Sequence, residues 1–215
     1  MTINNLVQGG LYVALLVLLA WPLGSFMARV YEGQRTLLDV VLGPVERLFY
    51  RLAGVKPQVE MKWTAYAAAM LLFNLLGLLA VYALQRLQHV LPLNPMSLGP
   101  VSPDSAFNTA VSFATNTNWQ GYGGETTMSY LTQMLGLTVQ NFVSAATGMA
   151  VLVALVRGLA RKQVETIGNF WVDMVRSTLY VLLPLSLVLA VFLVSQGVVQ
   201  TFAPSRTVAL LEATT

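Results

Sequence analysis

The residues with the clearest chemical potential lie in one neutral, polar segment between Ser102 and Glu125, which reads SPDSAFNTAVSFATNTNWQGYGGE. Its centre, residues 115–120, combines hydroxyl and amide side chains and carries no charge. The segment lies between two stretches that are apolar and long enough to cross a bilayer. Irregular backbone is tolerated at membrane depth only where it is buried in protein or lines a watery path. The segment therefore predicts passage of an ion rather than chemistry on a substrate.

A short helix is predicted just before this polar run. Ser102 is a suitable N-cap, Pro103 suits the first helical position, and Asp104 lies at the positive end of the helix dipole. We expect a pore helix over residues 102–114, which at about 1.5 Å per residue is ~18 Å long and too short to span. Its carbonyl end, aimed at a cavity, would favour a cation.

Residues 115–120 are then expected to run extended and to offer successive carbonyl oxygens to a pore axis. Rings of such carbonyls can replace the hydration shell of potassium. Asn and Gln side chains would brace the strand or line its mouth, and Gly121, Gly123 and Gly124 would turn the chain back out. The alternative at this point is an exposed, Gly-rich outer loop with no role in ion binding.

Polar residues of the third apolar stretch share one helical face, because they are spaced by seven and then four positions. They predict a pore lining, and interhelical hydrogen bonding is the alternative. The pore-lining candidates are Gln133, Gln140 and Ser144. Asn74 and Gly77, in the second stretch, are interpreted as packing residues, and Pro184 is expected to kink the fourth.

Composition places the whole chain in a membrane. Its 215 residues are 56% hydrophobic and 10% charged, whereas soluble domains carry roughly 25% charged residues. Four windows near or above the ~20 residues that a bilayer core requires lack Asp, Glu, Lys, Arg and His. We expect one all-α membrane domain over residues 1–215, with spans at about 11–28, 65–84, 128–156 and 177–196.

The basic residues set the expected orientation. Ten of the twelve Lys and Arg residues fall in the loops after the first and third spans, and only Arg86 and Arg206 fall on the other side. The positive-inside rule then puts the N-terminus and the Ser102 segment outside. An amphipathic segment at 34–53, interrupted at Gly43 and Pro44, predicts a cytoplasmic helix pair. Two interpretations stay open for it, an interfacial position and packing on the bundle.

Several kinds of chemistry are excluded by what the sequence lacks. It has no Cys, so it has neither a disulfide framework nor a thiolate metal site. A P-loop, an HExxH motif, a nucleophile elbow and paired membrane carboxylates are also missing, so we expect no hydrolysis by this chain. His89, the single histidine, has no partner cluster and is expected to be solvated or structural.

Two longer motifs, AFNTAVSFATNTNWQGYGGET and LTQMLGLTVQNFVSAATGMAV, resemble the A subunit of the Kdp potassium-transporting ATPases of bacteria and archaea. WPLGS, LPLNP and GNFWVDMVR are also similar to that subunit, so the resemblance covers essentially the whole chain. It implies an all-α integral membrane protein with one N-terminal span, one helix–pore-helix–helix repeat of the potassium-channel type, and the first span of a second repeat. It further implies that the first selectivity filter comprises Thr115, Asn116, Thr117, Asn118 and Gln120.

The resemblance also implies the ion and the partners. Potassium is the only metal ion expected, held through Asn116, Thr117 and Asn118 and passed to a P-type ATPase subunit that hydrolyses ATP. A small single-span subunit assists, no other cofactor is implied, and the location is the bacterial or archaeal cell membrane. Since the family has four repeats, this chain is expected to be truncated at Thr215. The rival hypothesis is a non-transporting membrane scaffold that binds only the partner subunits.

Overall fold

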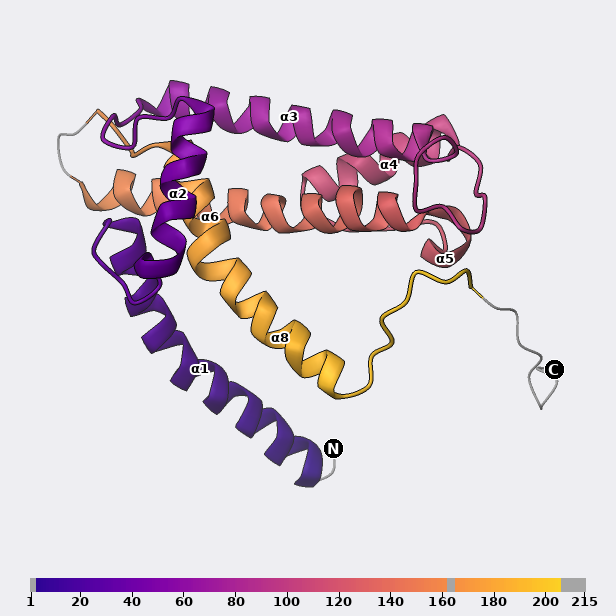
Figure 1. Cartoon of the computed structure of the whole chain (residues 1–215). Helices are drawn as coiled ribbons and strands as arrows, with labels where there is room; N and C mark the ends of the chain where they lie inside the picture. The colour runs from indigo at the N-terminus through magenta and orange to yellow at the C-terminus, as the bar shows by residue number, and fades with distance from the viewer. Residues whose placement is uncertain (1–2, 162–164, 206–215) are drawn as a thin grey trace.

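The computed structural model describes residues 3–161 and 165–205, so Lys162, Arg206 and Thr215 lie outside the described residues (Figure 1). Within these ranges the chain is helical and forms no strand beyond an isolated bridge between Lys62 and Thr166. The elements are α1 (Ile3–Tyr31), α2 (Asp39–Ala53), α3 (Trp63–Leu87), α4 (Pro103–Ala114), α5 (Gly124–Thr127), η1 (Thr132–Thr138), α6 (Val139–Ala160), α7 (Phe170–Arg176), η2 (Ser177–Leu182) and α8 (Leu183–Ser195).

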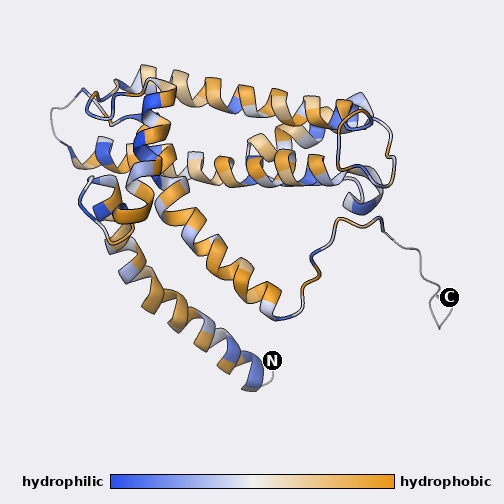
Figure 2. Ribbon diagram, in the orientation of Figure 1, coloured by the Kyte–Doolittle hydropathy of each residue, from blue (hydrophilic) through white to orange (hydrophobic). Residues whose placement is uncertain are grey.

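Four helical runs of the described chain are long and apolar enough to cross a membrane, and this confirms the all-α membrane class. Their apolar surfaces and polar ends are visible in Figure 2. The third and fourth runs each join several elements, and both contain a widened π-helical stretch, η1 and η2. The second of these lies directly before Pro184. The four runs are Asn4–Tyr31, Trp63–Leu87, Thr132–Ala160 and Phe170–Ser195.

The bundle is built around α3 and α6, which lie side by side in opposite directions (Figure 1). α4 packs mainly on α3 and also on α6 at one end of this pair. Ala106 and Ala110, which follow each other by one turn on α4, are fully buried, and Phe113 is nearly so. Small side chains let helix backbones approach closely, which is how a short helix fits between two spans.

Helix α6 lies close against α3 at Gly77. A β-carbon added there would lie 2.3 Å from Oε1 of Gln140, closer than real atoms come. The position of Gly77 is therefore a packing position, as the sequence predicts, and Gln140 is the residue packed against it.

Hydrogen bonds from one buried side chain hold the loops on either side of α4. Nε2 of Gln88, at the end of α3, donates to the carbonyls of Gly99 at 2.6 Å and Thr127 at 2.8 Å. Its Oε1 accepts from the amide of Ser129 at 3.0 Å. Gln88 is fully buried, so these bonds form away from water. They fix both the entry to α4 and the return from the polar loop.

The predicted cytoplasmic helix pair is wrong in one respect, because α2 runs without a break from Asp39 to Ala53. Pro44 lies inside it, and Gly43 is buried beside the Arg47 and Asp39 side chains of the same helix. Pro44 lies in the second turn of α2, where its missing amide removes one backbone hydrogen bond without ending the helix. Residues 34–38, the start of the predicted amphipathic segment, precede the helix.

Candidate functional site

The polar loop starts at the inner end of α4, about midway along α3 and α6 (Figure 1). The last residues of α4, Ser112, Phe113 and Ala114, are buried, whereas residues 115–117 are exposed on one side. α4 itself begins after Ser102, as the sequence predicts, with Pro103 in its first turn. The Ser102 side chain makes no capping hydrogen bond, and Asp104 is exposed beside it in the same turn.

The backbone of the loop is turned and not extended as expected. Asn116 and Asn118 have left-handed φ angles of 58° and 56°, a conformation that Asn tolerates better than most residues. The amides of Thr117 and Asn118 both donate to the carbonyl of Ser112, at 2.9 and 3.2 Å. The last carbonyls of a helix lack partners within the helix, and the loop wraps back to supply donors for one of them.

This wrapping fixes where the loop carbonyls point. In a planar trans peptide the C=O bond is directed opposite to the following N–H bond, and no described peptide of the chain is cis. Because the amides of Thr117 and Asn118 face Ser112, the carbonyls of Asn116 and Thr117 face away from it. The amide of Asn116 donates to Phe113 at 3.3 Å, so the carbonyl of Thr115 also faces away from α4. Three successive carbonyl oxygens thus point away from the helix end.

Side chains of the loop are held by α6. Nδ2 of Asn118 donates to Oδ1 of Asn141 at 2.8 Å, and Oγ of Ser144 donates to Oδ1 of Asn116 at 3.2 Å. Oδ1 of Asn118 is buried and has no partner within the described residues. The two asparagines therefore brace the loop from the α6 side, which leaves its backbone carbonyls as the outward-facing oxygen atoms.

Two threonines of the loop bond locally. Oγ1 of Thr115 donates to the carbonyl of Val111 at 2.9 Å and lies 3.0 Å from Oγ1 of Thr117. The Ser112 hydroxyl donates to the carbonyl of Trp119 at 3.0 Å. That carbonyl is turned inward, so the outward-facing set ends before Trp119.

The other candidate residues are dispersed. Gln120 is exposed beyond the turn, and Nε2 of Gln133 donates to the carbonyls of Gly124 and Met128 at the outer end. Gln140 is buried against Gly77. Of the three pore-lining candidates, Ser144 is the one that forms a hydrogen bond to the loop, at 3.2 Å to Asn116. Asn141, also on α6, forms the second hydrogen bond between this helix and the loop. His89 is exposed in the outer loop, and no group of three or more potential His, Cys, Asp or Glu metal ligands occurs within the described residues.

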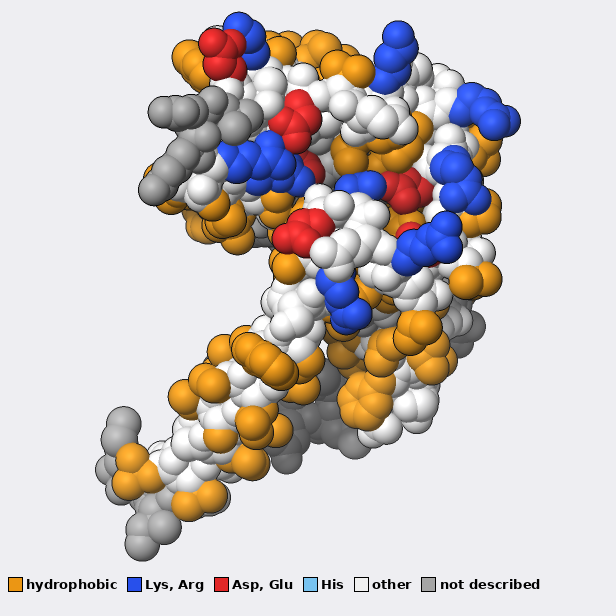
Figure 3. Space-filling model, turned by 90° about the vertical axis from the view of Figure 1, so that its left-hand side faces the viewer, with side chains coloured by type: hydrophobic (Ala, Val, Ile, Leu, Met, Phe, Trp, Pro, Cys, Tyr) orange, Lys and Arg blue, Asp and Glu red, His pale blue; other side chains and the backbone are white. Residues whose placement is uncertain are grey.

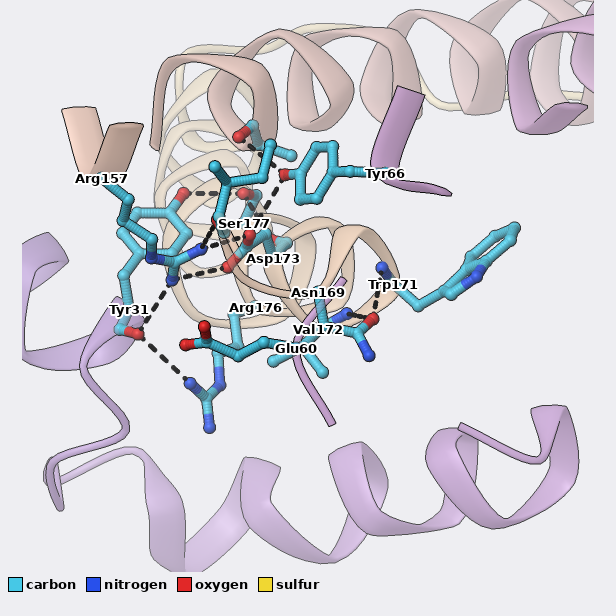
Figure 4. A network of polar contacts seen from close by, with 12 residues as sticks. Tyr31, Glu60, Tyr66, Arg157, Asn169, Trp171, Val172, Asp173, Arg176 and Ser177 are labelled. Carbon is cyan, nitrogen blue, oxygen red and sulfur yellow. Dashed lines mark hydrogen bonds and ion pairs between the residues drawn. The ribbon is translucent and has the colours of Figure 1, made fainter. Parts of the chain in front are cut away.

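A buried charged network at the opposite end of the bundle was not predicted (Figure 4). NH1 and NH2 of Arg157, on α6, donate to the two carboxylate oxygens of Asp173, on α7, at 2.6 and 2.9 Å. The Tyr66 hydroxyl donates to the same carboxylate at 3.1 Å, and Arg157 also reaches the carbonyl of Tyr31 at 3.3 Å. The network ties α1, α3, α6 and α7 together where the four spans meet.

A second charged cluster attaches α2 to the fourth span. Nε of Arg176 donates to Oε1 of Glu46 at 3.0 Å. The Tyr180 hydroxyl lies 2.8 Å from Oε2 of Glu46 and 3.0 Å from Oδ1 of Asp39. The sequence places Arg157 and Arg176 in loops because they border the apolar windows. The sequence signal for these ion pairs was the presence of their acidic partners, Asp173 and Glu46, close to the ends of the predicted helices.

Two carboxylates outside the spans have pKa values below the ordinary range. Burial raises the pKa of Asp39, but the hydrogen bonds from Thr36 and from the Tyr180 hydroxyl outweigh it and lower the pKa overall. For Glu60, the hydrogen bond from the Thr166 hydroxyl is the largest cause of the lowered pKa, and the Arg161 guanidinium adds to it. Both groups are therefore held in the charged form by their partners.

The structure defines a class first: an all-α, multi-pass membrane protein with a short helix and a neutral polar loop held between two of its spans. A family model described as "Potassium-transporting ATPase A subunit" matches residues 10–215 of the chain. The chain therefore belongs to the family of potassium-transporting ATPase A subunits, as the resemblance implied. Potassium is the ion that this family transports.

Curated relatives are similar over nearly the whole chain. A protein of Sorangium cellulosum named potassium-transporting ATPase potassium-binding subunit is 66% identical over 213 residues, which is 99% of this chain and 37% of the relative. Proteins of the same name from Methylococcus capsulatus and Herpetosiphon aurantiacus are 65% and 63% identical, over 100% and 97% of this chain and 36% of each relative. The chain thus spans about a third of the length of these relatives.

Proposed function

We propose that this chain is the N-terminal part of a potassium-binding subunit and supplies one segment of a potassium selectivity filter. Thr115, Asn116 and Thr117 provide backbone carbonyls for the ion, and Asn118 and Gln120 complete the segment. One observation carries the proposal: three successive carbonyls point away from α4, in a loop without charge, at the level of the bundle centre. Oxygen atoms of this kind can replace the hydration shell of a monovalent cation.

The arrangement has a repeat character that fits this role. α3, α4 and η1–α6 form a helix, a short helix with a polar loop, and a second helix, and α7–η2–α8 would open the next unit. A single loop offers oxygen atoms on one side only, and a cation requires a ring of them. Four such units in one subunit would close the ring, with this loop as about a quarter of it.

The proposed direction of transport rests on the charges, and the proposed partners rest on the family resemblance. Nine of the described basic residues lie at the end of the bundle where α2 crosses it, and Figure 3 shows that end. The positive-inside rule makes this the cytoplasmic end and puts the N-terminus and the filter entrance outside, at the cell membrane. Potassium would enter from there and pass to a P-type ATPase subunit that hydrolyses ATP, with a small single-span subunit beside it.

The test is potassium uptake at low external potassium by cells that depend on the intact subunit. Asn118→Asp adds a charge to the loop and removes the amide that donates to Asn141. We expect it and Gln120→Arg to weaken the apparent affinity for potassium at least tenfold and to alter selectivity. Gln200→Arg and Asn5→Asp are matched controls, since both residues are exposed and lie away from the loop. Unchanged affinity and selectivity in both loop variants would rule out the filter assignment.

The scaffold hypothesis makes the opposite prediction. A chain that only binds partner subunits would lose partner binding on disruption of its surface, while Asn118→Asp would leave both partner binding and uptake intact. Co-purification of the loop variants with the ATPase subunit therefore separates the hypotheses. Loss of uptake with retained co-purification supports the filter.

A further inference from the structure

Helix α2 has its polar and apolar faces reversed relative to a helix that lies between a protein and water. The residues turned toward the bundle include two carboxylates and follow helical spacing: Asp39, Leu42, Gly43, Glu46 and Tyr50. Val41, Leu48 and Leu52, spaced by seven and four, lie on the opposite side and are 70%, 52% and 78% exposed. A contiguous strip of exposed Val and Leu side chains marks a surface that contacts a membrane or another protein. We therefore expect an apolar neighbour on this outer face.

The carboxylates of α2 have their partners within the protein: Glu46 forms an ion pair and Asp39 accepts hydrogen bonds. Glu46 accepts from Arg176 at 3.0 Å and from the Tyr50 hydroxyl at 2.7 Å. Asp39 and Glu46 both lie within hydrogen-bond distance of the Tyr180 hydroxyl. The helix therefore presents no acidic group on its outer side.

One flank of α2 is basic. Arg47 and Arg51 are one turn apart, both are exposed, and neither takes part in an ion pair within the described residues. They share one flank of the helix, since 47 and 51 are four positions apart, and the Arg47 guanidinium lies beside Gly43. The flank is thus a pair of cations beside a strip of Val and Leu side chains.

The placement of α2 matches the surface of a bilayer. It runs across the bundle rather than along α3 and α6 (Figure 1), at the end where Lys and Arg side chains gather (Figure 3). α1 ends there, α3 begins there, and α6 and α7 meet there. A transverse helix at this level lies in the interface between acyl chains and headgroups.

We propose that α2 is an interfacial helix that binds anionic phospholipid. Its outer face, Val41, Leu48 and Leu52, enters the acyl region of the adjacent leaflet, and Arg47 and Arg51 bind headgroup phosphates. A protein partner would need acidic groups opposite this flank and a dry apolar surface opposite the Leu residues. The bilayer supplies both chemistries at the place where α2 lies, and it is present whichever subunits surround the chain.

Residues 1–215 contain no Cys, so a single labelled Cys can be placed in this chain once any reactive Cys elsewhere in the complex has been replaced. The intact complex carrying Leu48→Cys with an attached fluorophore is reconstituted in phosphatidylcholine vesicles with a minor fraction of brominated lipid. Brominated phosphatidylglycerol should quench the label more than the same fraction of brominated phosphatidylcholine. Basic residues near a lipid surface each add roughly a fivefold preference for anionic lipid, so this excess should be clearly measurable.

Arg47→Gln with Arg51→Gln should abolish the excess quenching by phosphatidylglycerol and leave quenching by phosphatidylcholine unchanged. Arg35→Gln with Lys56→Gln, a matched loss of two charges at the same end but outside α2, should keep the excess. Equal quenching by the two brominated lipids while Arg47 and Arg51 are both present would overturn the anionic preference. Absence of quenching by either lipid would overturn the interfacial position, because it would mean that protein or water covers Leu48.

Discussion

Breaking the buried ion pair between Arg157 and Asp173 should destabilise the bundle far more than breaking an exposed ion pair of the same length. The buried pair is 2.6 Å long, with side chains 15% and 1% exposed. The pair between Lys62 and Glu165 is 2.7 Å long, with side chains 68% and 78% exposed. The shortest distances are nearly equal, so the two pairs differ mainly in burial and in the additional hydrogen bonds to Asp173.

The magnitudes follow from what each substitution leaves behind. Asp173→Asn removes the charge opposite Arg157 but keeps an acceptor for Tyr66, and we expect a loss of about 3 kcal/mol. Arg157→Gln strands a carboxylate that is almost fully buried, so we expect a larger loss of about 4 kcal/mol. Glu165→Gln breaks a solvated pair and should change stability by less than ~0.5 kcal/mol.

The assay is unfolding of the intact subunit in mixed micelles with a rising fraction of denaturing detergent, followed by tryptophan fluorescence. Arg157→Met combined with Asp173→Leu removes both charges and should unfold within ~1 kcal/mol of the unsubstituted protein. This double variant separates the loss of an ion pair from damage to packing. If Asp173→Asn unfolds at the same detergent fraction as Glu165→Gln, the reasoning from burial is refuted.

Three further predictions concern packing, the loop brace and pH. Gly77→Ala should destabilise the subunit by about 1–3 kcal/mol through the clash with Gln140, and Gln140→Ala should restore most of that loss in the same unfolding assay. Asn141→Leu should alter the potassium-to-sodium selectivity of uptake at unchanged expression, because it removes the acceptor for Asn118; unchanged selectivity would show that the brace is dispensable. The lowered pKa of Glu60 means that folding favours its charged form. Its contribution to stability is therefore fully present above about pH 4.3, the pKa of an unperturbed Glu, and is lost as the pH falls through the lower pKa of the folded state. Stability measured against pH should therefore decline less steeply below pH 4.3 in Glu60→Gln, and an unchanged slope would contradict this.

The helical framework could be predicted because its causes are local. Long uncharged windows predict spans whatever surrounds them, and Ser102 followed by Pro103 indicates a helix start from a few residues. The short helix α4 ends at Ala114, where Thr and Asn follow, and these residues compete for backbone hydrogen bonds in any context. The windows fell short of the helix ends because charged residues such as Arg157 continue the helix after the apolar stretch stops.

The shape of the loop and the buried charges depend on partners distant in sequence. Thr and Asn in residues 115–118 suit both extended and turned backbone, and the choice is made by the unpaired carbonyl of Ser112 and by Asn141 on another helix. Asp173 lies 16 positions from Arg157, far beyond the three or four positions at which side chains of one helix meet. A pattern in one stretch of sequence cannot report such a contact, whereas composition alone can report a membrane span.

Neutral polar groups and ionised groups lie at different levels of this bundle. Around the loop, the polar contacts are neutral and involve amides and hydroxyls: Asn116 and Asn118 with Asn141 and Ser144. Ionised groups such as Arg157 and Asp173 are paired with each other near the other end of the spans. A fixed carboxylate beside the carbonyls would bind a cation strongly but hinder its release, whereas conduction requires binding weak enough for the ion to leave. In the proposed filter, carbonyl dipoles held by neutral braces would satisfy that requirement, and the separation from ion pairs would preserve it.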